Sequence, residues 1–152
     1  MMSPSELQAL LHEQIPISSA MGIRVTHADH RSVTLAAPLH ANHNHAGTVF
    51  AGSQHALASL AGWALLRRWA EAAHWQAELV LGKAEIRYLR PASADITVRA
   101  AITDAQLAGL RTARDEGGTA RLDLTLDLEA NNTVCARFKG HYVARASPSS
   151  PV

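Results

Sequence analysis

The dominant feature of the hydrophobic pattern is an apolar stretch over residues 56–66, followed by the charged residues Arg67 and Arg68. Between Arg31 and Arg67 the chain contains no Asp, Glu, Lys or Arg. A helix that is apolar nearly all the way round belongs in a protein core. Polar residues in and before the stretch, Gln54 among them, argue against a membrane span. We therefore predict a long core helix that emerges at the surface where these charges appear.

Alternating apolar and polar residues predict strands on both sides of this helix. Two short strands precede it, near residues 21–25 and 32–36. Four follow it, over residues 80–89, 96–103, 121–129 and 134–142. Each has one apolar and one wetter face, as strands of an antiparallel sheet do. In the first of these four, the pattern places Val80 on the apolar face and Leu81 on the other.

Two shorter helices are predicted, one near the N-terminus and one between the later strands. Ser3 or Ser5 can cap the first helix, whose apolar face includes Leu7 and Leu11, and Pro16 ends it. The second is predicted over residues 105–114, with glycines closing it at 117–118.

The order of two strands, one long buried helix and four strands indicates an α+β fold. An antiparallel sheet would curl around the helix, and this order resembles the hotdog fold. We expect a single hotdog domain over residues 1–146 and a disordered tail over residues 147–152, where Ser and Pro dominate.

Composition narrows the functional classes. The chain has 152 residues, of which 47% are hydrophobic and 18% charged, and its formal net charge is +1. This balance gives no electrostatic case for a nucleic-acid or membrane partner. Neither a Cys pair nor an HExxH spacing is present, so no metal site is expected. The single Cys135 and the lack of a signal-peptide pattern favour a cytoplasmic location.

The start of the core helix is the first candidate for a catalytic or ligand-binding site. The first four N–H groups of a helix have no partner within it, and they carry the positive end of its dipole. Ala51 and Gly52 are small, so an oxygen of a ligand can approach these N–H groups closely. Such a position can stabilise the oxyanion that forms when a thioester is attacked. The alternative is that Gly52 only allows tight packing and that Asn42 and Asn44 are turn residues.

The sequence around this loop resembles a known family. The run NHAGTVFAGS at residues 44–53, followed by LASLAGW at 57–63, is similar to the hotdog-fold acyl-CoA thioesterases. The nearest resemblance is to the bacterial thioesterase family named for the C-terminal domain of YiiD, whose loop is roughly N-x-N-x-x-G-T-x-F-A-G-S. Residues 86–91 resemble that family's third strand, and the likeness extends from about Leu10 to Arg145.

The resemblance implies a substrate and a site. The substrate would be an acyl thioester of coenzyme A or of acyl carrier protein, with no further cofactor. Asn44 would orient water or substrate, and Ala51 and Gly52 would hold the carbonyl oxygen. The other loop residues expected at the substrate are Asn42, His45, Gly47, Thr48, Phe50 and Ser53.

The chain departs from the family's relatives at the catalytic acid. Phenylacetate-type hotdog thioesterases carry the acid on the central helix, where this chain has Ser59. The 4-hydroxybenzoyl-CoA type carries an Asp in the loop, where this chain has Asn42 and Asn44. Neither usual carboxylate is present, so the general base or nucleophile must be another group.

Histidines are the first candidates to replace the acid, and Glu71 and Glu85 are alternatives by charge, with Glu71 expected on the emerging end of the helix. His43, His45 and His55 can each act as a base near neutral pH. His55 and Ser59 are four residues apart on a helix and share a face, so they can form a dyad, or Ser59 can be the nucleophile. The alternative is that Ser59 bonds its own helix backbone and that His55 is a packed neighbour.

Three cations on or near the first strand after the helix are candidate partners of the coenzyme A phosphates. They are Lys83, Arg87 and Arg90. The alternative is a solvated strand face.

The sequence therefore predicts a homo-oligomeric thioesterase, either a dimer or a dimer of dimers, with sites shared between subunits. Apolar residues among charges on the outer strand face, such as Leu89, would otherwise be an exposed liability. The rival function is a non-hydrolytic acyl-thioester-binding or dehydratase-like subunit that partners an acyltransferase. A purely structural subunit, which would bind no ligand, is a third possibility.

Overall fold

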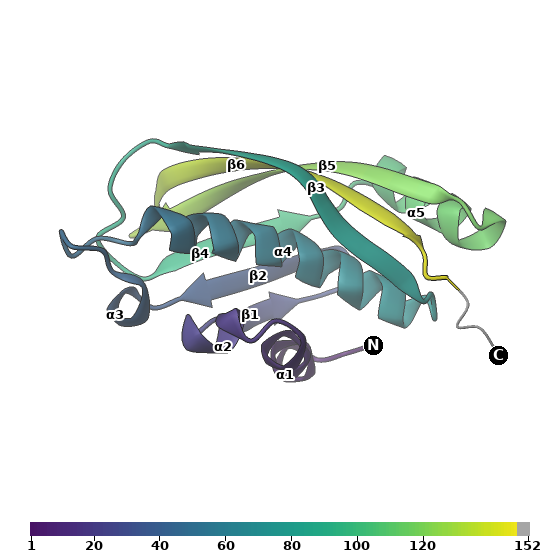
Figure 1. Ribbon diagram of the computed structural model, residues 1–152, viewed down its shortest axis with the longest axis horizontal. Coiled ribbons are helices and arrows are strands. Elements are labelled where there is room, and N and C mark those ends of the chain that lie inside the picture. The colour runs from purple at the N-terminus through teal and green to yellow at the C-terminus, as the bar shows by residue number, and fades with distance from the viewer. Residues whose placement is uncertain (149–152) are drawn as a thin grey trace.

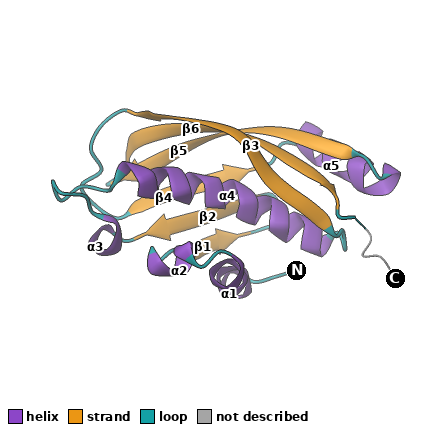
Figure 2. Cartoon of the chain, in the orientation of Figure 1, coloured by secondary structure: helices purple, strands orange, loops and turns teal. Residues whose placement is uncertain are grey.

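The computed structural model describes residues 1–148 and shows one antiparallel sheet wrapped around a long helix (Figure 1). The elements in chain order are α1 (Pro4–Gln14), α2 (Ile17–Ala20), β1 (Arg24–Ala28), β2 (Ser32–Ala37), α3 (Leu39–Asn42), α4 (Ala51–Ala72), β3 (Ala77–Tyr88), β4 (Ile96–Ala101), α5 (Asp104–Glu116), β5 (Thr119–Ala130) and β6 (Thr133–Ala146). The six strands follow the order β1-β2-β4-β5-β6-β3, and every neighbouring pair is antiparallel. The predicted α+β hotdog architecture is confirmed (Figure 2).

Helix α4 begins at Ala51, as predicted, and one side of it is the centre of the core. Leu57, Ala61 and Ala64 on that side are fully buried. The expectation that Arg68 emerges into solvent is wrong. Its side chain is buried and donates hydrogen bonds to the carbonyls of Met2, at 3.0 Å, and of the β1–β2 turn. The N-terminal segment and that turn cover this side of the helix, which a helical pattern alone does not reveal.

The strands differ from their predicted form at two places. Strand β1 begins at Arg24, because Met21 is still the C-cap of the four-residue helix α2. In β3 the pairing register shifts between Leu81 and Lys83. Leu81 therefore packs against the core and Val80 is 51% exposed, so their predicted faces were wrong. A one-residue slip moves every side chain before it to the opposite face.

The later elements follow the pattern more closely. Helix α5 has a capping box at Thr103 and ends at Gly117, which has a φ of 69°. Asn131 and Asn132 have positive φ in the tight turn between β5 and β6, as their residue types predict. At the C-terminus Ser147 donates its N–H to the Gln76 carbonyl at 2.8 Å. Residues 149–152, where the rest of the predicted tail falls, lie outside the described residues.

A buried tyrosine links β6 to the middle of α4. The Tyr142 hydroxyl donates to the Ser59 carbonyl at 2.9 Å, and burial raises the pKa of the phenol. Its ring lies where a side chain of Gly62 would be, because a Cβ there would come within 2.3 Å of it. The glycine thus allows the ring to cross the helix and fixes the helix against the sheet.

The strand β3 ends the sheet and presents a free edge within the single chain. Among residues 1–148, none of the helices has the length and apolar character needed to cross a membrane.

Candidate active site

The loop between α3 and α4 is closed by Asn44. Its Oδ1 accepts hydrogen bonds from the backbone N–H groups of Ala46, at 2.9 Å, and Thr48, at 3.1 Å. Its Nδ2 donates to the Thr48 hydroxyl at 2.9 Å. Gly47 completes the turn with a φ of 77°, a backbone conformation that favours glycine. Asn44 therefore shapes the loop, and one hydrogen of its Nδ2 has no partner among the described residues.

Asn42 anchors the loop from beneath. Its buried amide donates to the carbonyls of Met21 and Pro38, both at 2.8 Å. Its own carbonyl accepts from the Phe50 N–H at 2.7 Å. This residue ties the loop to the α2–β1 connection, while His45 is exposed at the tip.

A cavity of about 400 Å³ opens at the N-terminus of α4. It brings together Asn44, Thr48, Ala51 and Arg90 from the predicted set, which confirms only that these residues are neighbours. Its complete lining is Asn44, Thr48, Val49, Ala51, Gln54, Tyr88, Leu89, Arg90 and Pro91. The predicted residues His55, Ser59 and Lys83 do not line it.

The start of α4 has no side-chain cap. Phe50 is the N-cap residue; its carbonyl accepts from the Gln54 N–H at 3.1 Å, but its side chain supplies no hydrogen bond to the first helix N–H groups. The first N–H groups, including those of Ala51 and Gly52, also have no partner inside a helix. Phe50 folds back over Gly52, where a Cβ would lie 2.4 Å from its ring, and yet Phe50 is 54% exposed. A ligand oxygen can thus meet uncapped N–H donors at the positive end of the helix dipole.

Gln54 is a cavity residue that the sequence argument passed over. Its side chain is 4% exposed, and its Nε2 donates to the Val49 carbonyl at 3.1 Å. Its Oε1 is buried and has no hydrogen-bond partner within the described chain. The sequence feature that could have identified Gln54 is an amide side chain in the first turn of a largely apolar helix.

Tyr88 was also missed as a site residue. Its hydroxyl donates to the Ala51 carbonyl at 2.8 Å, so the end of β3 holds the first turn of α4. Burial raises the pKa of Tyr88 and so favours the protonated hydroxyl, the form that donates this hydrogen bond. The N–H groups of Leu89 and Arg90 both bond the Cys135 carbonyl, at 2.8 and 3.2 Å, and fix this strand end against β6.

His55 and Ser59 lie close together as predicted, but their bonds favour the structural alternative. The Ser59 hydroxyl lies 2.8 Å from the His55 carbonyl, to which it donates, and 3.3 Å from His55 Nδ1. A hydroxyl has one proton, and the shorter contact takes it. The His55 ring also packs edge to face on Phe138, with centroids 5.4 Å apart. Both residues are half-buried on the side of α4 that the sheet leaves partly open.

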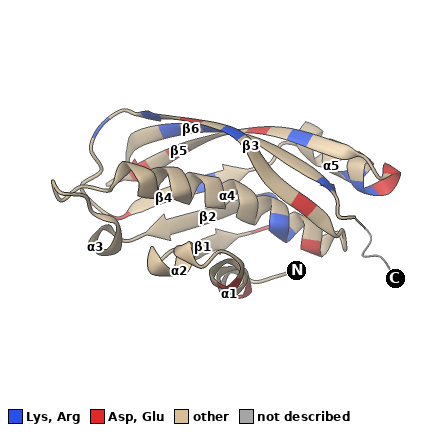
Figure 3. Ribbon diagram, viewed as in Figure 1, with Lys and Arg blue, Asp and Glu red and all other residues tan. Residues whose placement is uncertain are grey.

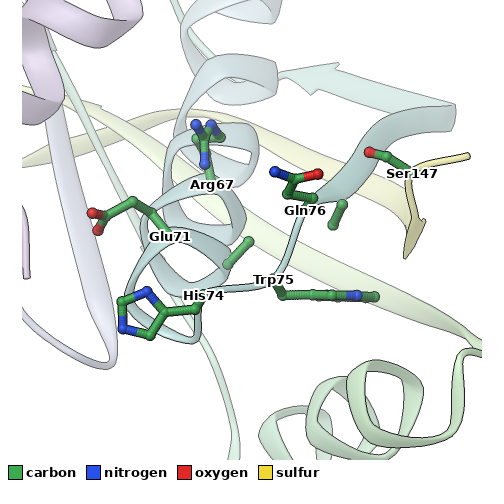
Figure 4. A pocket seen from close by; sticks show the side chains of 8 residues that line it. Arg67, Glu71, His74, Trp75, Gln76 and Ser147 are labelled. Atoms are coloured by element: carbon green, nitrogen blue, oxygen red, sulfur yellow. The ribbon is translucent and has the colours of Figure 1, made fainter. Parts of the chain in front are cut away.

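Glu71 belongs to the opposite end of α4. With Arg67, His74 and Gln76 it lines a cavity of about 530 Å³ near the start of β3 (Figure 4). Glu71 lies 20 residues after Ala51 on the same helix, which is about 30 Å at 1.5 Å per residue. Within one chain it therefore cannot reach the uncapped helix start.

The fold is that of the hotdog-fold thioesterases, as solved structures of similar sequence show. A putative thioesterase from Shewanella oneidensis has a TM-score of 0.84 at 29% identity, and the match covers 95% of this chain and 97% of that one. A probable thioesterase from Pseudomonas aeruginosa has a TM-score of 0.83 at 30% identity, with 97% and 99% covered. A Chlorobaculum tepidum protein of unknown function, at 21% identity and a TM-score of 0.87 over 95% and 94%, shares the fold.

The family itself is also clear. The chain belongs to the family described as "Putative thioesterase (yiiD_Cterm)", whose sequence model matches residues 4–146. The family expected from the motif at residues 44–63 is confirmed.

Proposed function

We propose that this protein hydrolyses acyl thioesters of coenzyme A or of acyl carrier protein at the N-terminus of α4. The observation that carries the proposal is the uncapped start of that helix, which opens into a cavity of about 400 Å³ lined by the Asn44 loop. Membership of the thioesterase family supports the reaction class. The unpaired Cys135 suits a cytoplasmic location for such an enzyme.

The chemistry follows from the positions of the groups. The carbonyl oxygen of the thioester would accept hydrogen bonds from the N–H groups of Ala51 and Gly52, which strengthen as negative charge develops on it. Water would attack the carbonyl carbon, the C–S bond would break, and the products would be a carboxylic acid and a free thiol. The remaining Nδ2 hydrogen of Asn44 would orient the reacting groups.

The mechanism also needs a general base to activate the water. None of the nine residues that line the cavity is an acid or a histidine. We propose that His55 is the base and that it acts from a second subunit, because it lies on the open side of α4 and does not line the cavity of its own chain.

The proposed assembly is a dimer through the free edge of β3. Val80 and Tyr88, both on this strand, are 51% and 46% exposed, which is high for large apolar residues at a sheet edge. A second copy would cover them and bring its own α4 alongside the site. Such a two-fold interface closes on itself, and a pair of these dimers would form the dimer of dimers.

Release of free thiol from a panel of acyl-CoA and acyl-carrier-protein thioesters tests the reaction. Hydrolysis above the background rate, lost on substitution at the helix start, would support the proposal. Binding without release would favour the rival, an acyl-thioester-binding subunit that partners an acyltransferase. The lack of a carboxylate in the cavity lining is the observation that favours this rival.

A further inference from the structure

Besides the cavity at the start of α4, here called the catalytic cavity, the outer face of the sheet carries a basic cavity. It measures about 200 Å³ and is lined by Glu85, Arg87, Leu89, Arg137 and Lys139. Figure 3 shows basic segments on both β3 and β6 in this part of the sheet. The strand pairing produces the cluster, because Arg87 stands opposite Arg137 and Glu85 opposite Lys139.

This arrangement of charges lowers the stability of the sheet, which is unexpected for a surface with only a structural role. Like charges directly opposite each other on antiparallel strands destabilise the pair. Asp127 on β5 offsets part of this cost, since its carboxylate takes two hydrogen bonds from Arg137, at 2.7 and 3.3 Å. Within residues 1–148, Arg87 and Lys139 have no carboxylate within 4.0 Å. Three cations thus share one cavity, and among the described residues only Arg137 has an ion-pair partner.

The basic cavity adjoins the catalytic cavity. Leu89 lines both, and Arg90, the next residue, lines the catalytic one. A ligand can therefore extend from the helix start across the exposed side chain of Leu89 to the three cations. The ligand that this path fits is apolar at its middle and anionic at its far end.

We propose that the cavity formed by Arg87, Arg137 and Lys139 binds the phosphates of coenzyme A and makes the protein selective for acyl-CoA. This inference rests on the proposed function, because it places the thioester end at Ala51 and Gly52. The pantetheine arm crosses Leu89. The diphosphate and the 3′-phosphate of the nucleotide meet the cations through charge-assisted hydrogen bonds. A carrier protein presents one phosphodiester and lacks the 3′-phosphate, so it engages fewer of these donors.

Binding measured by calorimetry separates this site from the chemistry. The probes are coenzyme A, dephospho-coenzyme A and pantetheine, none of which needs to be hydrolysed. The variant Arg87→Gln/Lys139→Gln removes the two cations without ion-pair partners and keeps the Arg137–Asp127 pair. Arg121→Gln is the matched control, because it removes an exposed cation of β5 that does not line the cavity.

The expected result is an order of affinity from coenzyme A to dephospho-coenzyme A to pantetheine. The double variant should lose about tenfold or more in affinity for coenzyme A, a conservative figure for two charge-assisted hydrogen bonds. It should bind pantetheine like the wild type, and Arg121→Gln should match the wild type throughout. Raised salt should weaken only the phosphate-dependent part.

Two outcomes overturn the site: a double variant that binds coenzyme A as tightly as the wild type does, or a wild type that binds pantetheine equally well. A double variant that is impaired only on acyl-carrier-protein thioesters overturns the selectivity for coenzyme A. Failure of the proposed hydrolysis looks different, because the affinity order and its loss would remain while no thiol is released.

Discussion

At the scale of single residues, the site depends on glycine at the start of α4. Gly52→Val should lower kcat/KM by about 10²-fold or more, since a branched side chain blocks approach to the N–H groups and displaces Phe50. Rates of thiol release on folded protein measure this effect. Gly109→Ala is the matched control, because the structure has open space around that helical glycine. Full activity in Gly52→Val would show that the oxyanion is not bound at these N–H groups.

Two substitutions at Asn44 remove different hydrogen-bonding groups and so separate its two roles. Asn44→Ala removes the acceptor of two backbone N–H groups, and it should lower kcat/KM by about 10²-fold. Asn44→Asp keeps that acceptor and loses the Nδ2 donor. A low rate in Asn44→Asp with an unchanged urea midpoint would assign the effect to the donor, and a normal rate would leave Asn44 a loop-shaping role only.

The buried Oε1 of Gln54 has no hydrogen-bond partner among residues 1–148, which costs stability. Gln54→Met keeps the volume and removes both this acceptor and the Nε2 donor to the Val49 carbonyl; the gain and the loss oppose each other, so stability should change by less than about 1 kcal/mol. If the amide serves the substrate in the cavity, thiol release should nevertheless fall by tenfold or more, on the order of one lost hydrogen bond. Urea unfolding and kinetics together give the answer. Unchanged kinetics would make Gln54 a packing residue.

At the scale of elements, the β1–β2 turn depends on one carboxylate. Asp29 accepts from the N–H groups of Arg31 and Ser32, both at 2.7 Å, and contacts His27 at 2.9 Å. The His27 hydrogen bond, followed by the backbone bonds, lowers the pKa of Asp29 well below its usual 3.8. A lowered folded-state pKa stabilises the protein fully above the unfolded value. This contribution is lost as the pH falls from there through the folded value.

The test compares urea midpoints of the wild type and Asp29→Asn across pH. The gap between them should narrow as the pH falls below about pH 4. The side chain is 42% exposed, so solvent screening keeps the gap small. A gap that stays constant at all acid pH values would contradict the assignment.

Most of the element order could be predicted because period-two alternation survives in long strands such as β5. The failures have physical causes. The register shift after Leu81 inverts a face without leaving a mark in the residue pattern. Helices α2 and α3 have four residues each, too few to show a helical period. Arg68 is buried by segments distant in sequence.

The candidate site, like the fold, could be predicted from the sequence only in part. Asn44, Thr48 and Ala51 lie close together in the sequence, so the motif indicated that they would meet. Tyr88 joins them through the packing of β3 on α4, and Lys139 joins Arg87 through the register of β6. Sequence patterns give strands and faces, but they do not give the pairing between distant strands.

At the scale of the whole molecule, the prediction is an obligate dimer with shared sites. The chain leaves β3 as a free edge, and Val80 and Tyr88 on that strand are about half exposed. On α4 the side with His55, Ser59 and Trp63 is only half-buried. A second copy that pairs along β3 covers both features, and its open helix side faces the Asn44 loop of the first. Sedimentation at micromolar concentration should therefore show no monomer.

Complementation tests whether the sites are shared. Asn44→Ala alters the loop and His55→Gln alters the helix, and each alone should be nearly inactive. If a site takes its loop from one chain and its helix from the other, mixing the two variants yields hybrid dimers. In each hybrid, one site then carries both changes and the other carries neither. At equal concentrations half of the dimers are hybrids, so about a quarter of the wild-type activity should return by random pairing.

Mixing either variant with itself is the control. If the mixture stays inactive while the subunits exchange, each site belongs to one chain. A monomer with full activity would remove the need for the interface altogether.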